Sequence, residues 1–272
     1  MRGDVVRNFH DPQSDKEVKG CLEFFYNDRV PDWGANKPGT FHLCQRHKEQ
    51  YRFATLHDTQ HRIAVYSAYR FQTVTDELKT DNNWFLEPQL VDQNWDGEMM
   101  DTMDLEALHK GVSLGEKQAL DNDYKSSGYD RGHLSPRQHH SGVARQATFT
   151  LTNVVPQTRH LNGDVWDKYE NELVKEFKKN KCDRAYMLVG AIPSDSSILT
   201  NTLKKEGRVN IPTHVWNAYC CVDQNGRPIN SGGATAANTA KGSQLQRLTL
   251  QKLQEFLSTE SPPQLFLNNC EA

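Results

Sequence analysis

The sequence has 272 residues, of which 36% are hydrophobic and 25% charged, and its formal net charge is −3. This composition, spread without low-complexity runs, is that of an ordinary globular protein and excludes the disordered and fibrous classes. The negative charge excludes a uniformly basic nucleic-acid binder, so a polyanionic partner would have to be held by a local positive patch or by a bound cation.

We expect a single domain over residues 1–272, because the chain shows no composition break and no linker. No segment approaches the roughly 18 to 20 apolar residues that cross a bilayer, so we expect no membrane partner. The first four residues, Met1 to Asp4, lack the apolar segment of a signal peptide. If the protein is secreted, we therefore expect this sequence to be that of its mature form.

The predicted elements begin with an N-terminal extension of about residues 1–50, in which charged residues, proline and glycine surround an aromatic segment. Farther along, β-branched and aromatic residues in alternating or continuous apolar runs predict strands. These strands are Arg62 to Phe71, Ala147 to Val155, Ala185 to Ile192 and Val215 to Val222.

Apolar residues at helical spacing predict two helices, Asp164 to Lys179 and Leu245 to Leu257. Between Asn225 and Ser243, the content of glycine, serine, asparagine and alanine predicts a mobile loop. Strands grouped among helices predict an α+β fold, with a central, mostly antiparallel sheet flanked by helices.

The six cysteines include no C-x-x-C pair, which argues against a structural zinc site. Cys220 and Cys221 are neighbours in a predicted strand, where consecutive side chains point to opposite faces and need separate partners. We expect up to three disulfides, with Cys21 paired to nearby Cys44. The adjacent pair would share the two remaining cysteines, in either order: Cys182 and Cys270. Six reduced, buried cysteines in a cytosolic protein are the alternative, whereas paired ones favour secretion.

The most informative segment runs from Tyr129 to Glu170. It contains Tyr129-Asp130-Arg131-Gly132-His133-Leu134-Ser135-Pro136, Thr148-Phe149-Thr150-Leu151-Thr152-Asn153, Pro156-Gln157 and His160-Leu161-Asn162, and it ends with Trp166 and Glu170. This order predicts a strand that carries a histidine, a second strand that ends in an asparagine, and a helix that opens near another asparagine. We expect this strand-strand-helix unit at about residues 129–179.

Phosphodiester cleavage needs an activated water and neutralisation of charge at phosphorus. His133 suits the first task because histidine titrates near pH 6.5, and Gly132 beside it allows close backbone approach to a phosphate. Arg131 offers a planar donor fork for a phosphate, or else it forms a structural salt bridge with Asp130 or another residue.

Asn162, Trp166 and Glu170 are spaced by four and so lie on roughly one side of a helix. Mg²⁺ keeps most of its waters and commonly takes one or two protein ligands, so the single amide oxygen of Asn162 can hold it. Glu170 would orient the metal-bound waters. Because oxygen ligation discriminates poorly, Mn²⁺ or Ca²⁺ could substitute.

This segment resembles the DNA/RNA non-specific endonuclease family, the ββα-metal or His-Me finger nucleases that include mitochondrial endonuclease G. The resemblance rests on Asp-Arg-Gly-His, on Thr-Phe-x-x-x-Asn followed by Pro-Gln, and on Leu-Asn with a tryptophan and a glutamate four and eight residues later. With Leu188-Val189-Gly190 and Ile211 to Trp216, the similarity covers roughly Arg52 to Val222.

The resemblance implies the ββα-metal fold and a metal-dependent endonuclease that cuts DNA and/or RNA without sequence specificity, leaving 5′-phosphate ends. It implies His133 as general base and Asn162 as metal ligand. Glu170 and Asn153 would be supporting residues, and Arg131 a phosphate-side or structural group.

Within the family, the chain most resembles a group of vertebrate secretory-pathway proteins. The similar segments are Cys21 with Phe24-Phe25-Tyr26, Cys44-Gln45-Arg46, Arg52 to Leu56, Val65 to Ala68, Glu87-Pro88-Gln89 and Cys220-Cys221. Some members of this group lack the signature histidine. This chain keeps it, and the resemblance therefore implies an active enzyme.

Other readings of these residues are open. A secreted protein could keep the nuclease fold and act by binding, with weak or no catalysis, or a metallophosphoesterase could act on a different substrate. His139, His140 and His160 could suggest zinc, but no carboxylate or cysteine pattern completes such a site, and we expect exposed loop histidines. The basic residues near the site could bind a phosphate backbone or form only a solvated face. They are Arg137, Arg145, Arg159, Lys168, Lys175, Lys178, Lys179 and Lys181.

Overall fold

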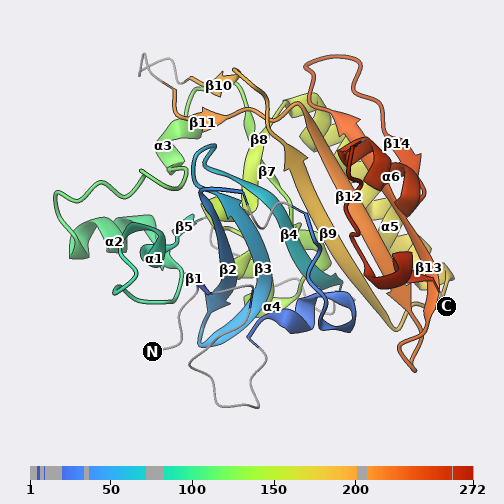
Figure 1. Ribbon diagram of the computed structural model, residues 1–272. Helices are drawn as coiled ribbons and strands as arrows, with labels where there is room; N and C mark the ends of the chain where they lie inside the picture. Colours follow the sequence, from blue (N-terminus) through green and yellow to red (C-terminus); the bar gives the residue numbers. More distant parts are fainter. Residues whose placement is uncertain are drawn as a thin grey trace.

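The computed structural model describes residues 5, 6, 9, 20–33, 37–71, 83–200, 207–258 and 260–271. Eight strands form one antiparallel sheet in the order β1-β2-β3-β4-β9-β12-β13-β14 (Figure 1). They are β1 (Val5–Val6), β2 (Thr40–His47), β3 (Gln50–Asp58), β4 (Ile63–Phe71), β9 (Arg184–Ile192), β12 (His214–Val222), β13 (Pro228–Ala237) and β14 (Gln246–Leu248). The predicted α+β fold with a mostly antiparallel sheet is confirmed.

Short strand pairs and helices surround this sheet. The pairs are β5 (Phe85–Leu86) with β6 (Met100–Asp101), β7 (Asp130–His133) with β8 (Val154–Gln157), and β10 (Ile198–Leu199) with β11 (Val209–Asn210). The α-helices are α1 (Pro88–Val91), α2 (Thr102–Leu108), α3 (Asp121–Tyr124), α4 (Gly142–Ala147), α5 (Asp167–Lys179) and α6 (Leu250–Leu257). A π-helix, Leu161–Trp166, leads into α5, and short 3-10 helices lie at Leu22–Phe24, Tyr26–Asp28, Arg137–His139, Leu151–Asn153 and Leu267–Cys270. None of the described helices is long and apolar enough to cross a bilayer.

The sheet is covered on both faces, and strand β12 shows why. Its side chains alternate, so that Val215 and Tyr219 join the core under α5, whereas Trp216 and Cys220 join the core under α6. Figure 1 accordingly shows α5 and α6 on opposite sides of β12 and β13. The β7–β8 pair lies on the α5 face of the sheet.

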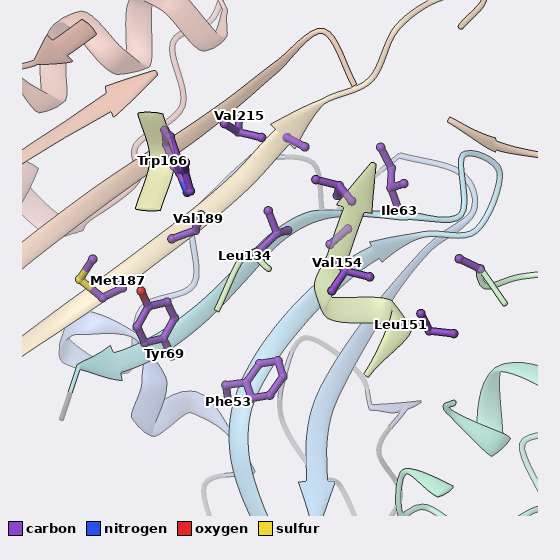
Figure 2. Packing of buried hydrophobic residues seen from close by; sticks show 14 of the residues in the cluster. Phe53, Ile63, Tyr69, Leu134, Leu151, Val154, Trp166, Met187, Val189 and Val215 are labelled. Carbon is purple, nitrogen blue, oxygen red and sulfur yellow. The ribbon is translucent and has the colours of Figure 1, made fainter. Parts of the chain in front are cut away.

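Buried apolar side chains fix the β7–β8 pair to the sheet. Leu134, Leu151 and Val154 are fully buried in the same core as Val189 and Tyr69 of the sheet. Figure 2 shows Leu134 beside Val189 of β9, and Val154 in the same layer of buried side chains. This packing sets the position of the strand that ends at His133.

Three disulfides complete the described cores, and no free cysteine is found. Cys21 pairs with Cys44, as expected. The order left open by the sequence is Cys182–Cys221 and Cys220–Cys270. The adjacent cysteines therefore serve opposite faces of β12.

The strand predicted at Ala147 to Val155 is wrong over most of its length. Ala147 ends α4, Leu151–Asn153 is a 3-10 turn, and a regular strand begins only at Val154. The apolar and β-branched residues are buried as expected, but Thr150 and Thr152 direct their hydroxyls to the buried carboxylate of Glu87, at 2.7 and 3.0 Å. A polar network, and not a sheet ladder, holds this segment.

Two predictions in the C-terminal third also fail. The loop expected between Asn225 and Ser243 contains β13, a ten-residue strand paired along β12. Its small residues fit a tight space, since a Cβ on Gly233 would lie 2.4 Å from the carbonyl oxygen of Asn217. The helix expected from Leu245 begins only at Leu250, because Gln246–Leu248 pairs with β13 and Thr249 caps the helix.

Candidate active site

The short strand β7 delivers His133 to the α5 face of the molecule. It pairs with β8 in antiparallel register, with His133 opposite Val154 and Gly132 opposite Val155. A Cβ on Gly132 would lie 2.2 Å from Cδ of Gln157, a fully buried side chain. The glycine therefore makes room for Gln157 within the strand pair, whereas the sequence suggested an approach to phosphate.

The imidazole of His133 lies between two aromatic rings. Its centroid is 5.6 Å from that of Trp84 and 5.1 Å from that of Phe149, which meets it edge-on. Burial, with a smaller contribution from the positive charge of Arg137, lowers the pKa of His133 to about 4. The ring is therefore neutral near pH 7. Its buried Nε2 has no hydrogen-bond partner among the described residues.

A cavity of about 490 Å³ opens beside His133 and brings together four of the five predicted site residues: Arg131, His133, Asn162 and Glu170. Its other lining residues are Pro136, Arg137, Gln138, Phe149, Gly163 and Asp167. A polar cavity with a neutral imidazole, an amide and a carboxyl group can accommodate a phosphate together with a hydrated cation.

Asn162 reaches the cavity from the π-helix that precedes α5. This π-helix begins at Leu161, three residues before the predicted helix start at Asp164. Its Nδ2 donates to Oδ2 of Asp130 at 3.3 Å, on the same strand that carries His133. This contact uses the donor end of the amide and leaves the carbonyl oxygen as the end that can bind a cation.

Glu170 lies on α5, at the inner side of the cavity. Its Oε2 accepts a hydrogen bond from Nε2 of Gln138 at 2.6 Å. Burial raises the pKa of Glu170 to about 8, with a contribution from the negative charge of Asp167, while the hydrogen bond of Gln138 opposes the shift. Such a carboxyl group gains its negative charge when a cation binds nearby.

Arg131 is held by residues outside the signature motif. Its Nη2 donates to Oδ1 of Asp121 at 2.5 Å, and its guanidinium lies over the rings of Trp84 and Tyr124 at 5.3 and 5.1 Å. The sequence left two roles open for Arg131, a phosphate contact and a structural salt bridge. In the structure Arg131 forms a salt bridge, and its partner is Asp121 and not Asp130.

Asn153 lies beneath the cavity and is fully buried. Its Oδ1 accepts hydrogen bonds from the backbone nitrogen of Ser135 and from Oγ of Ser67, both at 2.9 Å. Its Nδ2 donates to the carbonyl oxygens of Ser135 and Thr148, both at 3.0 Å. Asn153 thus fixes the backbone after His133 and the backbone before Phe149, and it does not line the cavity.

The expectation that His139 and His140 are exposed loop histidines is wrong. Both are buried, at 1% and 2% exposure, and they bond to Tyr69 and Ser135 at 2.8 Å. Of the three histidines named in the sequence analysis, His160 alone has a partly exposed side chain, at 38%. Among the described residues, no group of three or more His, Cys, Asp and Glu side chains could hold a metal ion.

Sequence reasoning missed Trp84, Phe149 and Gln138 as members of the site. Phe149 was visible in the motif, but only as a strand residue. Trp84 lies far upstream and reaches His133 because Phe85 forms a parallel bridge with Thr150. No local pattern carries that long-range contact, so only an alignment or a structure could have found Trp84.

The arrangement of the sheet and helices is that of the endonuclease G fold. A chain in the crystal structure of the EndoG/EndoGI complex superimposes with a TM-score of 0.51 at 16% identity, over 78% of this chain and 82% of that chain. At this identity, the likeness concerns the fold alone. The sequence model of the DNA/RNA non-specific endonucleases matches residues 38–259, and the chain therefore belongs to this family.

Similar proteins include the endonuclease domain-containing 1 protein of Homo sapiens, 34% identical over 92% of this chain and 47% of that protein. Mitochondrial endonuclease G of Homo sapiens is 33% identical over 36% of this chain and 35% of its own length. A nuclease of Nostoc is 34% identical over 47% of this chain and 43% of its own. The chain thus spans about half the length of the relatives that it matches along most of its sequence.

Proposed function

We propose that the protein is a metal-dependent, sequence-nonspecific endonuclease that hydrolyses phosphodiester bonds of DNA and/or RNA and leaves 5′-phosphate ends. One observation carries this proposal. The neutral imidazole of His133 lines the same cavity as Asn162 and Glu170. The names of the similar proteins point to the same chemistry.

The residues fit a hydrated Mg²⁺ better than a fully protein-ligated metal. The free end of Asn162 is a neutral oxygen donor, and the carboxyl group of Glu170 can hold waters of the ion. The absence of a larger His, Cys, Asp and Glu cluster among the described side chains argues against a closed zinc site. When bound, the cation would neutralise charge on the phosphate oxygens and on the leaving oxygen. Mn²⁺ or Ca²⁺ would be accepted by the same donors.

In this proposal, His133 acts as general base. Its low pKa keeps the imidazole neutral, so that a ring nitrogen on the cavity side can take a proton from a water beside the phosphate. The rings of Trp84 and Phe149 hold its orientation, and Asn153 fixes the backbone on both sides. Asn162 and Glu170 would place the hydrated cation across the phosphate from the base.

Substrate selection would follow from the lack of base-reading contacts. The cavity offers groups that suit phosphate and a cation, and no element among its lining residues is suited to enter a groove and read base edges. The three disulfides, together with the likeness to the endonuclease domain-containing 1 proteins, support a location in the secretory pathway or outside the cell.

Plasmid and RNA digestion with purified protein tests the proposal. The wild type should cut with Mg²⁺ and stop with a chelator, and His133→Ala should lower kcat at least about 100-fold because general-base help is lost. His61→Ala, which removes a partly exposed histidine outside the cavity, is the matched control and should keep the wild-type rate. A folded, metal-supplied wild type that leaves DNA and RNA intact would instead support a binding protein. Activity restricted to small phosphodiesters would support a metallophosphoesterase with another substrate.

A further inference from the structure

Arg137 is an arginine that lines the cavity and has no acidic partner among the described residues. It lines the cavity, its side chain is exposed, and it makes no ion pair among the described residues. Arg131, the arginine of the signature motif, also lines the cavity, but its charge is paired with Asp121. Arg137 is therefore the basic side chain of the cavity whose charge is available to a ligand.

The other two flanking arginines are placed differently. Arg159 is 88% exposed, lies 3.9 Å from Asp130, and is not among the cavity residues. Arg145 is half-buried on α4 and does not line the cavity either. Of the three flanking arginines Arg137, Arg145 and Arg159, Arg137 is thus the one that lines the cavity.

The backbone that carries Arg137 is fixed, although its side chain is open. Arg137 is the first residue of the 3-10 helix Arg137–His139. The side chains of the other two residues of this helix are held by hydrogen bonds. Gln138 bonds to the carboxyl group of Glu170, and His139 bonds to the hydroxyl of Tyr69 and to the carbonyl oxygen of Glu170. A guanidinium group carried by a fixed backbone loses less conformational freedom on binding a ligand than one carried by a mobile loop.

We propose that Arg137, and not the motif residue Arg131, donates the guanidinium contact to a substrate phosphate in the cavity beside His133. This inference rests on the proposed function and names a substrate-binding residue for it. A guanidinium offers two parallel donors that match two phosphate oxygens, and such charge-assisted pairs are the stronger hydrogen bonds of proteins. The influence of Arg137 on the pKa of His133 agrees with their closeness.

The experiment compares Arg137→Gln, Arg137→Lys and Arg227→Gln with the wild type. Arg227→Gln removes the same charge from an exposed position in the turn between β12 and β13, outside the cavity. Cleavage of a single-stranded DNA oligonucleotide gives kcat/KM for each protein. Arg137→Gln should lower it about 10- to 100-fold, as loss of a charged hydrogen bond does. Arg137→Lys should keep an intermediate rate, and Arg227→Gln the wild-type rate.

Binding of the same oligonucleotide is measured in parallel on the His133→Ala background, where cleavage does not interfere. Affinity is followed from about 50 to about 200 mM salt. Loss of one phosphate contact should flatten the slope of log K against log salt by about 0.7 for a single strand. Only the Arg137→Gln protein should show this change. Thermal melting of each variant reports whether it is folded.

The outcomes separate the two proposals. If the wild type cuts and Arg137→Gln matches Arg227→Gln in rate and in salt slope, the Arg137 inference is overturned and the proposed function stands. If the wild type does not cut, but Arg137→Gln weakens oligonucleotide binding and flattens its slope, the proposed catalysis fails and the phosphate contact stands.

Discussion

Oδ1 of Asn153 lies 2.9 Å from the backbone nitrogen of Ser135, two residues beyond His133. The same amide bonds to Thr148, one residue before the phenylalanine that packs on the imidazole. One buried side chain therefore sets two of the contacts that orient His133. This makes Asn153 a positioning residue whose effects can be measured.

Replacing Asn153 with alanine should destabilise the fold by about 3 kcal/mol, because it leaves buried backbone and hydroxyl groups without partners. Urea unfolding gives the value. Asn171→Ala is the control, since Asn171 is exposed on α5 and bonds only within its own helix, and it should change stability by less than about 0.5 kcal/mol. Equal stability of the two variants would show that the hydrogen bonds of Asn153 beneath the site contribute little to the free energy of unfolding.

Stability should fall steeply in mild acid because of four buried histidines. Burial lowers the pKa of His57, His133 and His139 to about 4 and that of His140 to about 3. The unfolded chain takes up these protons near pH 6.5, before the folded protein does, so the stability present above pH 6.5 is lost as the pH falls towards 4. Glu170 contributes to the pH dependence with the opposite sign, because its raised pKa makes the folded protein bind a proton before the unfolded chain does.

The net slope near pH 5 should be about 4 kcal/mol per pH unit. Urea unfolding at several pH values between about 4.5 and 7 measures this slope. His57→Gln should reduce the number of protons taken up on unfolding, and hence the slope, by the contribution of about one proton. A stability that stays flat across this range would contradict the burial of these rings in the folded protein.

Mg²⁺ binding should release close to one proton per ion near pH 7. The carboxyl group of Glu170, with its pKa of about 8, is then mostly protonated, and a nearby cation favours its ionised form. The apparent affinity for Mg²⁺ should weaken by about tenfold for each pH unit below 8. Calorimetry in buffers of different ionisation enthalpy counts the protons.

Glu170→Gln should abolish this proton release, and Asp167→Asn should reduce it by lowering the pKa of Glu170. The same calorimetry on a variant of the exposed Glu172, Glu172→Gln, serves as control, because Glu172 faces Arg247 and not the cavity. Mg²⁺ binding without proton release in the wild type would argue against a role for Glu170 beside the ion.

Thiol titration of the denatured protein should find no free thiol before reduction and six after it. Each pair removes conformations from the unfolded chain, and the Cys220–Cys270 loop of 50 residues should stabilise the fold by about 4 kcal/mol. The double variant Cys220→Ser with Cys270→Ser measures this by unfolding. Six free thiols in protein isolated without reductant would remove the support for secretion.

Much of the fold could be predicted where side-chain patterns are strong. The alternating or continuous apolar runs of β4, β9 and β12 are predicted to within a residue or two. Strand β13 was missed because its glycine, alanine and serine residues have no strand pattern, and its conformation depends on pairing with β12. The turn before β8 was missed because its threonines bond to Glu87, which is distant in sequence.

The candidate site was partly predictable for a similar reason. His133, Asn162 and Glu170 lie within one segment of the chain, so their spacing is visible in the sequence and they line one cavity. Trp84, which lies over the guanidinium of Arg131, reaches it through long-range packing, and Asp121 binds it from ten residues upstream. The availability of Arg137 was also hidden, because whether an arginine has an acidic partner is decided by the folded structure.

The two bridges at the adjacent cysteines enclose overlapping stretches of chain, Cys182 to Cys221 and Cys220 to Cys270. Every peptide bond from Cys182 to Cys270 lies inside at least one of them. A protease that cuts once anywhere in this third of the protein would therefore leave both pieces covalently joined. They would separate on a gel only after a reducing agent is added, so a nicked chain would remain one particle.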